Sequence, residues 1–196
     1  MSREVAEAEF NRDKTEFGFW VYLMTDCILF GTLFATYVVL QPNTFGGPGP
    51  RELFSLPFVL TETLILLTSS FTCGLAVLAA KRRDLMWTYV LFTLTFLLGA
   101  AFLSMELYEF NRMVHEGNSW TRSGFLSAFF TLVGTHGLHI TAGLIWMFTL
   151  LWQMGSKEIT DRMVRRLSLL SMFWHFLDVV WIFIFTIVYL IGVGGV

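Results

Sequence analysis

The sequence predicts an all-α membrane protein, a five-transmembrane-helix bundle with its N-terminus in the cytoplasm and its C-terminus outside. Of the 196 residues, 55% are hydrophobic and only 14% are charged, whereas soluble proteins carry about 25% charged residues. Five apolar runs are long enough to cross a bilayer as helices, which takes about 20 residues each. These two observations predict the fold class, and the distribution of lysine and arginine predicts the orientation.

The elements follow from these runs in chain order. Residues 1–17 mix both charge signs and contain no apolar core, so they are predicted to be a cytoplasmic segment and not a secretory signal. The segment "QPNTFGGPGPRELFSLP" holds all four prolines and three glycines, which predicts a loop without a helix. The chain is predicted to form one membrane domain, residues 1–196, with spans over residues 18–40, 57–80, 86–109, 125–153 and 168–192.

Lysine and arginine fall unevenly on the two sides of these spans. Loops on the cytoplasmic side of a membrane protein carry an excess of both residues. With the N-terminus inside, three of them lie outside, namely Arg51, Arg112 and Arg122. The cytoplasmic side then holds the other ten, which are Arg3, Arg12, Lys14, Lys81, Arg82, Arg83, Lys157, Arg162, Arg165 and Arg166.

Eight ionisable side chains fall within the predicted spans. Such groups are expensive in hydrocarbon, so they either pair with one another or mark a functional site. A helical rise of about 1.5 Å per residue sorts them into layers. The inner layer contains Asp26, His175 and Asp178, about 10–15 Å from the cytoplasmic edge. The outer layer contains Glu62, His136 and His139, with Glu106 and Glu109 close to the outer surface.

The histidines of "GTHGLHITAGLIWM" allow two interpretations. His136 and His139 are three residues apart and share a helical face beside glycines that permit close approach of a neighbour. As haem ligands, one of them would have to face His175 across a gap. As packing groups, both are expected to bond to a carboxylate or carbonyl of a neighbouring helix, or to a lipid headgroup. We expect the second arrangement for both residues.

The remaining groups suggest a proton relay or plain helix contacts. Asp26, Asp178, Glu62 and Glu106 form a series of increasing depth, although spacing alone is a weak signal. A lone carboxylate is costly in lipid, so Asp26 is expected to be neutral or hydrogen-bonded, with His175 or a lipid headgroup as its partner.

Four stretches of the chain resemble subunit III of the haem–copper terminal oxidases. They are "FGFWVYLMTDCILF", "LLGAAFLSMELYEF", "SGFLSAFFTLVGTHGLHITAGLIWM" and "FWHFLDVVWIFIFTIVYL", which follow one another over nearly the whole chain. A five-helix form that begins at "GFWVYLMTD" resembles the subunit of cytochrome bo type quinol oxidases. Asp26 stands where much of the family has a membrane glutamate that reacts with a hydrophobic carbodiimide, so its side chain is one methylene shorter.

The resemblance implies a non-catalytic subunit of a respiratory quinol oxidase in the bacterial inner membrane. Haem b, haem o and copper would belong to the catalytic subunit I, with subunits II and IV as further partners and no cofactor in this chain. The helices would form two groups around a V-shaped cleft filled with phospholipid. The subunit would support assembly, proton uptake and stability. The histidine content agrees, because a catalytic oxidase subunit needs about six histidines for two haems and a copper and this chain has four.

Two other functions remain open from the residues alone. One is a haem b membrane anchor of a dehydrogenase, which would use two of the histidines. The other is a small transporter that depends on the buried carboxylates. The chain shows neither the inverted repeat nor the interrupted helices of many transporters.

Overall fold

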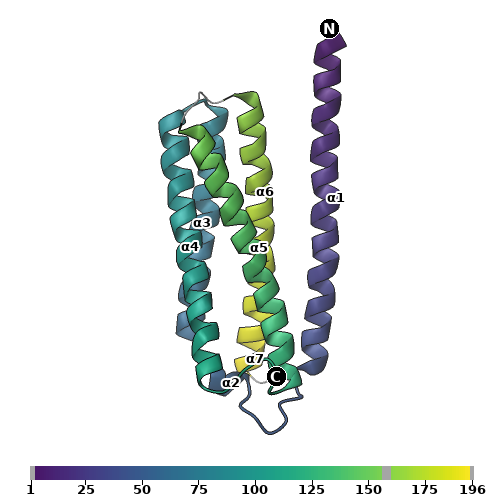
Figure 1. The fold of residues 1–196 in the computed structure, drawn as a ribbon, viewed down its shortest axis with the longest axis vertical. Coiled ribbons are helices and arrows are strands. Elements are labelled where there is room, and N and C mark those ends of the chain that lie inside the picture. The colour runs from purple at the N-terminus through teal and green to yellow at the C-terminus, as the bar shows by residue number, and fades with distance from the viewer. Residues whose placement is uncertain (1–2, 156–159, 195–196) are drawn as a thin grey trace.

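Five long helices dominate the computed structural model, which describes residues 3–155 and 160–194 (Figure 1). They are α1 (Arg3–Leu40), α3 (Leu56–Lys81), α4 (Leu85–His115), α5 (Gly124–Met154) and α6 (Asp161–Ile184). Each of the first four contains a stretch long and apolar enough to cross a membrane, and the fifth such stretch runs from the start of α6 to Gly194. The five predicted spans and the all-α class are therefore confirmed. The orientation and the single domain stay predictions.

Helices α3 to α6 form one group, and α1 lies at its side (Figure 1). Within the group α3 packs on α4 and α6, and α5 packs on α4 and α6. Helix α1 contacts α5 and, less extensively, α6. Its ribbon comes closest to α5 at its C-terminal end (Figure 1), and nearer its start Phe19 contacts Trp146 of α5 at 6.1 Å.

The prediction of a loop without a helix between the first two spans is wrong. The short helix α2 (Pro50–Leu53) lies within this segment, and α3 already begins at Leu56. Proline at the first helical position loses no hydrogen bond, because the N–H groups of the first turn have no partner within the helix. The guanidinium of Arg51 donates to the carbonyls of Val193 (2.9 Å) and Gly194 (3.0 Å), which fixes α2 to the C-terminal turn.

Several helix ends also differ from the predicted spans. Helix α4 continues through His115, beyond the predicted end at residue 109, and α6 begins at Asp161 instead of residue 168. Hydropathy marks where apolar residues end, whereas a helix ends where its backbone is capped. At the start of α6, the backbone N–H of Met163 donates to the hydroxyl of Thr160 (3.3 Å).

The last span is not a uniform α-helix. After α6 the chain continues as the π-helix η1 (Phe185–Ile191) and the short helix α7 (Gly192–Gly194). π-Helical turns are rare and occur frequently at functional sites. Val188 and Tyr189 of η1 are fully buried, so this turn places a phenol in the interior.

Two buried tryptophans of α6 join the helices of the group. The indole N–H of Trp174 donates to the hydroxyl of Ser69 (3.1 Å), and that of Trp181 donates to Thr63 (3.0 Å). Both acceptors lie on α3. A Cβ atom added at Gly99 of α4 would lie 2.7 Å from the Trp174 ring, so the ring and this backbone are in close contact.

Candidate functional site

The eight ionisable groups singled out in the sequence separate into several sets. Six are buried, His139 is partly buried and His175 is exposed at the surface of the chain. Asp26 lies with His139, the three glutamates lie together, and Asp178 interacts electrostatically with His175. The two predicted layers therefore correspond only in part to the contacts.

Asp26 of α1 and His139 of α5 form the polar contact between these helices. His139 Nε2 lies 3.5 Å from Asp26 Oδ2, and Nδ1 lies 2.7 Å from the carbonyl oxygen of Thr135. Because a carbonyl can only accept, Nδ1 carries a proton and Nε2 is free for Asp26. The contact is then favourable when a second proton lies on either Nε2 or the carboxyl group.

The expected partner of Asp26 is wrong. Asp26 contacts His139 of α5 and not His175. The contact joins a residue of the predicted inner layer to one of the predicted outer layer. The contact with Asp26 agrees with the expectation that His139 meets a carboxylate of a neighbouring helix, whereas the Thr135 carbonyl belongs to its own helix.

The same expectation is wrong for His136. Its imidazole is fully buried, and neither ring nitrogen finds a hydrogen-bond partner among the described residues. The ring instead stacks on Trp181 at 5.3 Å and 29°, and Phe102 packs edge-on at 6.1 Å and 89°. Phe30 of α1 packs against a further side at 6.4 Å. His136 is thus a member of an aromatic cluster.

The three glutamates gather at the end of the bundle that contains α2. Glu109 Oε2 accepts a hydrogen bond from the hydroxyl of Tyr189 (3.1 Å), and its Oε1 lies 3.9 Å from the guanidinium of Arg112. Glu62 and Glu106 interact electrostatically with Glu109. The sequence indicates the glutamates but not Tyr189, whose position depends on η1. The spacing of Arg112, three residues after Glu109 on one helix, was an available signal.

His175 and Asp178 do not join these sets into a relay. His175 Nδ1 lies 2.7 Å from the carbonyl oxygen of Ser171, one turn earlier on α6. Asp178 interacts electrostatically with His175 and lies beside Ser70 of α3, and its Oδ1 has no hydrogen-bond partner among the described residues.

A groove follows the line between α1 and α6. Its apolar part has a volume of about 330 Å³ and is lined by Trp20, Leu23, Met24, Met172, His175 and Val179. A polar hollow of about 430 Å³, lined among others by Glu16, Lys81, Asp161, Arg165 and Ser168, also reaches Met172. The two spaces share this residue, and we call the polar hollow the charged mouth of the groove.

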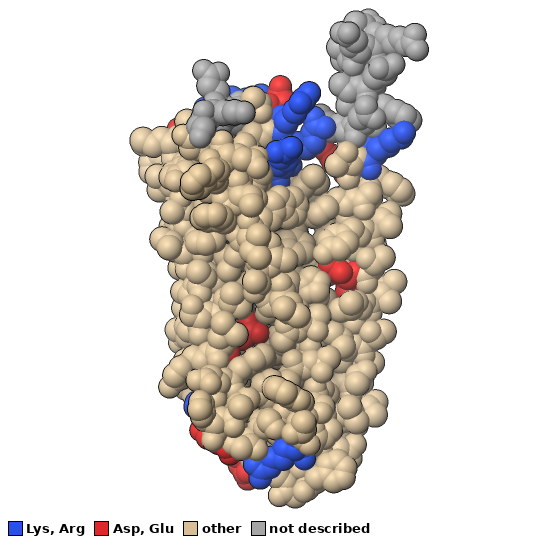
Figure 2. Space-filling model, in the orientation of Figure 1, with Lys and Arg blue, Asp and Glu red and all other residues tan. Residues whose placement is uncertain are grey.

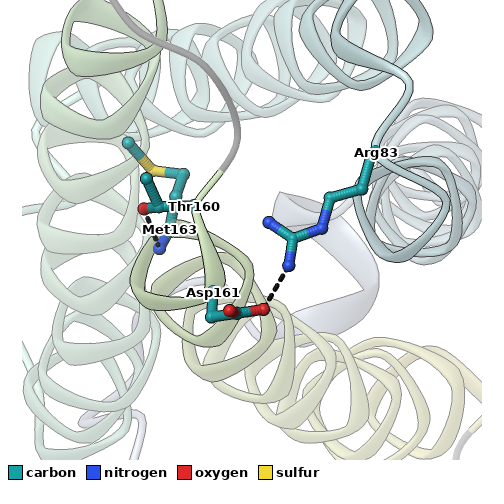
Figure 3. A network of polar contacts seen from close by, with 4 residues as sticks. All are labelled: Arg83, Thr160, Asp161 and Met163. Atoms are coloured by element: carbon teal, nitrogen blue, oxygen red, sulfur yellow. Dashed lines mark hydrogen bonds and ion pairs between the residues drawn. The ribbon is translucent and has the colours of Figure 1, made fainter.

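At the mouth, an ion pair joins two elements that are distant in sequence. Arg83, at the turn between α3 and α4, reaches Asp161 at the first turn of α6, next to the Thr160 cap (Figure 3). Lysine and arginine are concentrated at this end of the molecule, whereas the middle of the visible face shows small patches of Asp and Glu and no Lys or Arg (Figure 2).

The histidines are not arranged as a haem or metal site in the described residues. No three His, Cys, Asp or Glu side chains there could hold a metal ion together. His136 is enclosed by aromatic rings, whereas His175 lines the groove beside α1, so they do not face each other as two haem ligands would.

Comparison with known proteins gives the family directly. The family model for cytochrome c oxidase subunit III matches residues 6–193. The chain is 54% identical to cytochrome bo(3) ubiquinol oxidase subunit 3 of Pseudomonas aeruginosa, over 91% of this chain and 85% of that protein. It is 47% identical to quinol oxidase subunit 3 of Bacillus subtilis, over 91% and 87%, and 47% identical to cytochrome c oxidase subunit 3 of a Bacillus species, over 91% and 86%. The chain belongs to the cytochrome c oxidase subunit III family.

Proposed function

We propose that this chain is the non-catalytic subunit III of a bacterial quinol oxidase in the inner membrane. The main support is the sequence identity of 54–56% to two Pseudomonas proteins named cytochrome bo(3) ubiquinol oxidase subunit 3, over 91% of the chain. Subunit I of the complex holds haem b, haem o and copper, and subunits II and IV complete it. The dehydrogenase anchor and the transporter have no support among the relatives.

The groove between α1 and α6 is the place where the subunit contributes to the complex through lipid. A phospholipid has apolar chains that fit against Trp20, Met24 and Val179 and a charged headgroup that fits the mouth at Lys81 and Arg165. A lipid bound there fills the space between α1 and the other helices, which direct contacts leave incompletely closed.

The contact between Asp26 and His139 supports proton uptake by the catalytic subunit. It lies inside the membrane, and Asp26 is close in sequence to Leu23 and Met24 of the groove. A carboxyl group and an imidazole that share a proton exchange it with waters or headgroups entering the groove. The pair would then hold a proton near the catalytic subunit without any redox chemistry of its own.

Purification of the complex tests the proposed function. An affinity tag on this chain should co-purify, in mild detergent, a partner that shows the visible absorption of haem b and haem o and oxidises quinol. The same chain, separated by stronger detergent, should show no haem absorption. Stoichiometric haem on the separated chain that disappears in His136→Ala or His175→Ala would instead identify a haem-binding anchor.

A further inference from the structure

The glutamates at the α2 end of the bundle form a polar site that the proposed function does not use. Its centre is Glu109 of α4, which contacts the Tyr189 hydroxyl (3.1 Å) from η1 and the Arg112 guanidinium (3.9 Å) from its own helix. Glu109 is 1% exposed and Tyr189 is fully buried. The Arg112 side chain is 35% exposed and donates to the carbonyl of Leu53 (3.2 Å). Arg112 therefore connects the site to the surface.

Two further carboxyl groups approach this centre with oxygen atoms that have no hydrogen-bond partner among the described residues. Glu62 of α3 is fully buried, and neither of its oxygens finds a partner among the described residues. Glu106 of α4 is 2% exposed, and its Oε2 is equally unpartnered. Glu62 interacts electrostatically with both other glutamates, and Tyr189 interacts with all three. Both side chains are thus directed into the same site.

The positive charge around the site is too small to neutralise three ionised carboxyl groups. Arg112 is the cation that the described contacts place there, and Tyr189 donates one neutral hydrogen bond. From α5 the neighbour of Glu106 is Gly137, at which an added Cβ would lie 2.7 Å from Oε1, and the adjacent His136 faces the ring of Trp181. Like charges that share a buried space cannot all stay ionised, unless cations or protons compensate them.

A metal ion is the poorer of these two compensations. Calcium requires six to eight oxygen ligands and magnesium a near-octahedral set, and the described residues do not gather a group that could hold a metal. Protons need no such geometry, because a neutral carboxylic acid requires only one acceptor for its own hydrogen.

We propose that Glu62, Glu106 and Glu109 form a buried proton-binding site, in which Glu62 and Glu106 hold protons and Glu109 is the carboxylate paired with Arg112. The protons exchange with the surface by way of Glu109, beside Arg112, which is the most exposed member of the site and stays charged. The π-helix η1 contributes by directing the Tyr189 hydroxyl at Glu109, which keeps the negative charge on that residue.

Infrared spectroscopy of the complete oxidase tests this site. Protonated carboxyl groups in an apolar setting give a C=O stretching band that shifts in heavy water. Glu62→Gln and Glu106→Gln should each remove the contribution of one such group. Both variants should keep the haem spectrum, the quinol oxidase rate and the thermal midpoint within about 2 °C of the wild type, because glutamine resembles a neutral glutamic acid in shape and charge.

Glu109→Gln is the matched control on the same helix. It should leave the band unchanged and lower the thermal midpoint, because it leaves the charge of Arg112 unpaired, and Arg112→Gln should lower it similarly. An unchanged band in both Glu62→Gln and Glu106→Gln would overturn the proposal. So would a loss of stability in these variants as large as in Glu109→Gln. If Glu62→Gln does not assemble, Glu106→Gln decides by the same two readouts.

Removal of metal ions tests the alternative that the site holds a cation instead of protons. A chelator that lowers the thermal midpoint of the wild type, but not of Glu62→Gln, would show that the site holds a cation and would overturn the proposal. Because the haem spectrum and the co-purification of subunit I are measured on the same samples, a failure of the site is distinguishable from a failure of the proposed function.

Discussion

Asp26 is a carboxyl group whose position in the membrane suggests a role in proton transfer, while its contact with His139 suggests a role in packing. Asparagine has nearly the same size and can donate its amide N–H to Nε2 of His139, so Asp26→Asn retains the contact between α1 and α5. We predict that this variant assembles normally and keeps most of the initial quinol oxidase turnover, because the chemistry takes place in the partner. Haem content and the rate over the first turnovers measure both quantities.

The comparison with Asp26→Leu separates the two roles, because leucine can neither carry a proton nor bond to His139. If the contact matters only for packing, the leucine variant loses stability and the asparagine variant does not. An Asp26→Asn complex that is fully assembled but inactive from the first turnover would contradict the prediction and identify Asp26 as an obligatory proton carrier.

His136 and His139 lie one turn apart, but we predict different effects on stability when each is replaced by phenylalanine. His136 has aromatic neighbours and no hydrogen-bond partner among the described residues, so His136→Phe should change the free energy of unfolding by less than about 1 kcal/mol. His139→Phe removes an imidazole that contacts Thr135 and Asp26 and should cost about 1–3 kcal/mol. Thermal inactivation of the two variants measures this difference. A greater loss in His136→Phe than in His139→Phe would be contrary to this account.

The sequence identifies these polar residues but not their partners. A depth read from the edge of a hydrophobic run is uncertain by about one turn, or about 5.4 Å, which is larger than any hydrogen bond. Asp26 shows the consequence, because it contacts His139 and not His175, although the sequence places His175 nearer to it in depth. For His136 the reason is different, because spacing does not reveal that the facing residues are Phe102 and Trp181.

At the scale of elements, two glycines in different helices test how tightly the group is packed. A Cβ atom at Gly99 would lie 2.7 Å from two ring atoms of Trp174, and the hydrogen bond of Trp174 to Ser69 holds that ring in place. Gly99→Ala should therefore cost about 1–3 kcal/mol in the free energy of unfolding. Gly31 of α1 has no atom within 4 Å of such a Cβ.

Gly31→Ala is the control for this prediction, and it should be neutral or stabilise by up to about 1 kcal/mol because alanine is the better helix former. Denaturation of both variants in detergent, followed by circular dichroism, gives the two values. Equal effects at the two positions would show that the contact between α4 and Trp174 is looser than the structure indicates.

Hydropathy locates the five spans but not the irregular elements. Helix α2 is too short for any periodicity, and Arg51, which holds it, finds its acceptors 142 and 143 residues away. The π-helix η1 has the same apolar composition as the α-helical part of the span, so composition cannot distinguish them. Tyr189 reaches Glu109 only because of this local change, and for that reason the sequence does not indicate its role.

At the scale of the whole molecule, α1 is the part least covered by its neighbours. Only 22% of its most apolar window is buried, against 50% for α5. Its exposed apolar residues and the groove beside α6 leave room for lipid and for other subunits of the complex. Two contacts hold the middle of α1 against His139 of α5. One is the polar contact of Asp26, and the other is the aromatic contact of Phe30 at 5.2 Å.

The orientation in the membrane is also a prediction about the whole molecule. In the structure the turn between α3 and α4 and the start of α6 lie at the end where α1 begins, and α7 lies at the opposite end (Figure 1). The end near the N-terminus holds most of the visible lysine and arginine (Figure 2). Because positively charged loops stay in the cytoplasm, we predict a cytoplasmic N-terminus and a C-terminus outside.

Reporter fusions in whole cells measure this orientation. Alkaline phosphatase, which becomes active only outside the cytoplasm, should be active when fused after Val196 and inactive when fused in the turn between α3 and α4. A fluorescent protein that folds only in the cytoplasm should give the reverse result. Replacing Lys81, Arg82 and Arg83 by glutamine removes three of the ten predicted inner charges, so it should weaken the preference without reversing it, since seven inner charges still exceed three outer ones. A C-terminal phosphatase fusion that is inactive in the unmodified chain would contradict the predicted orientation.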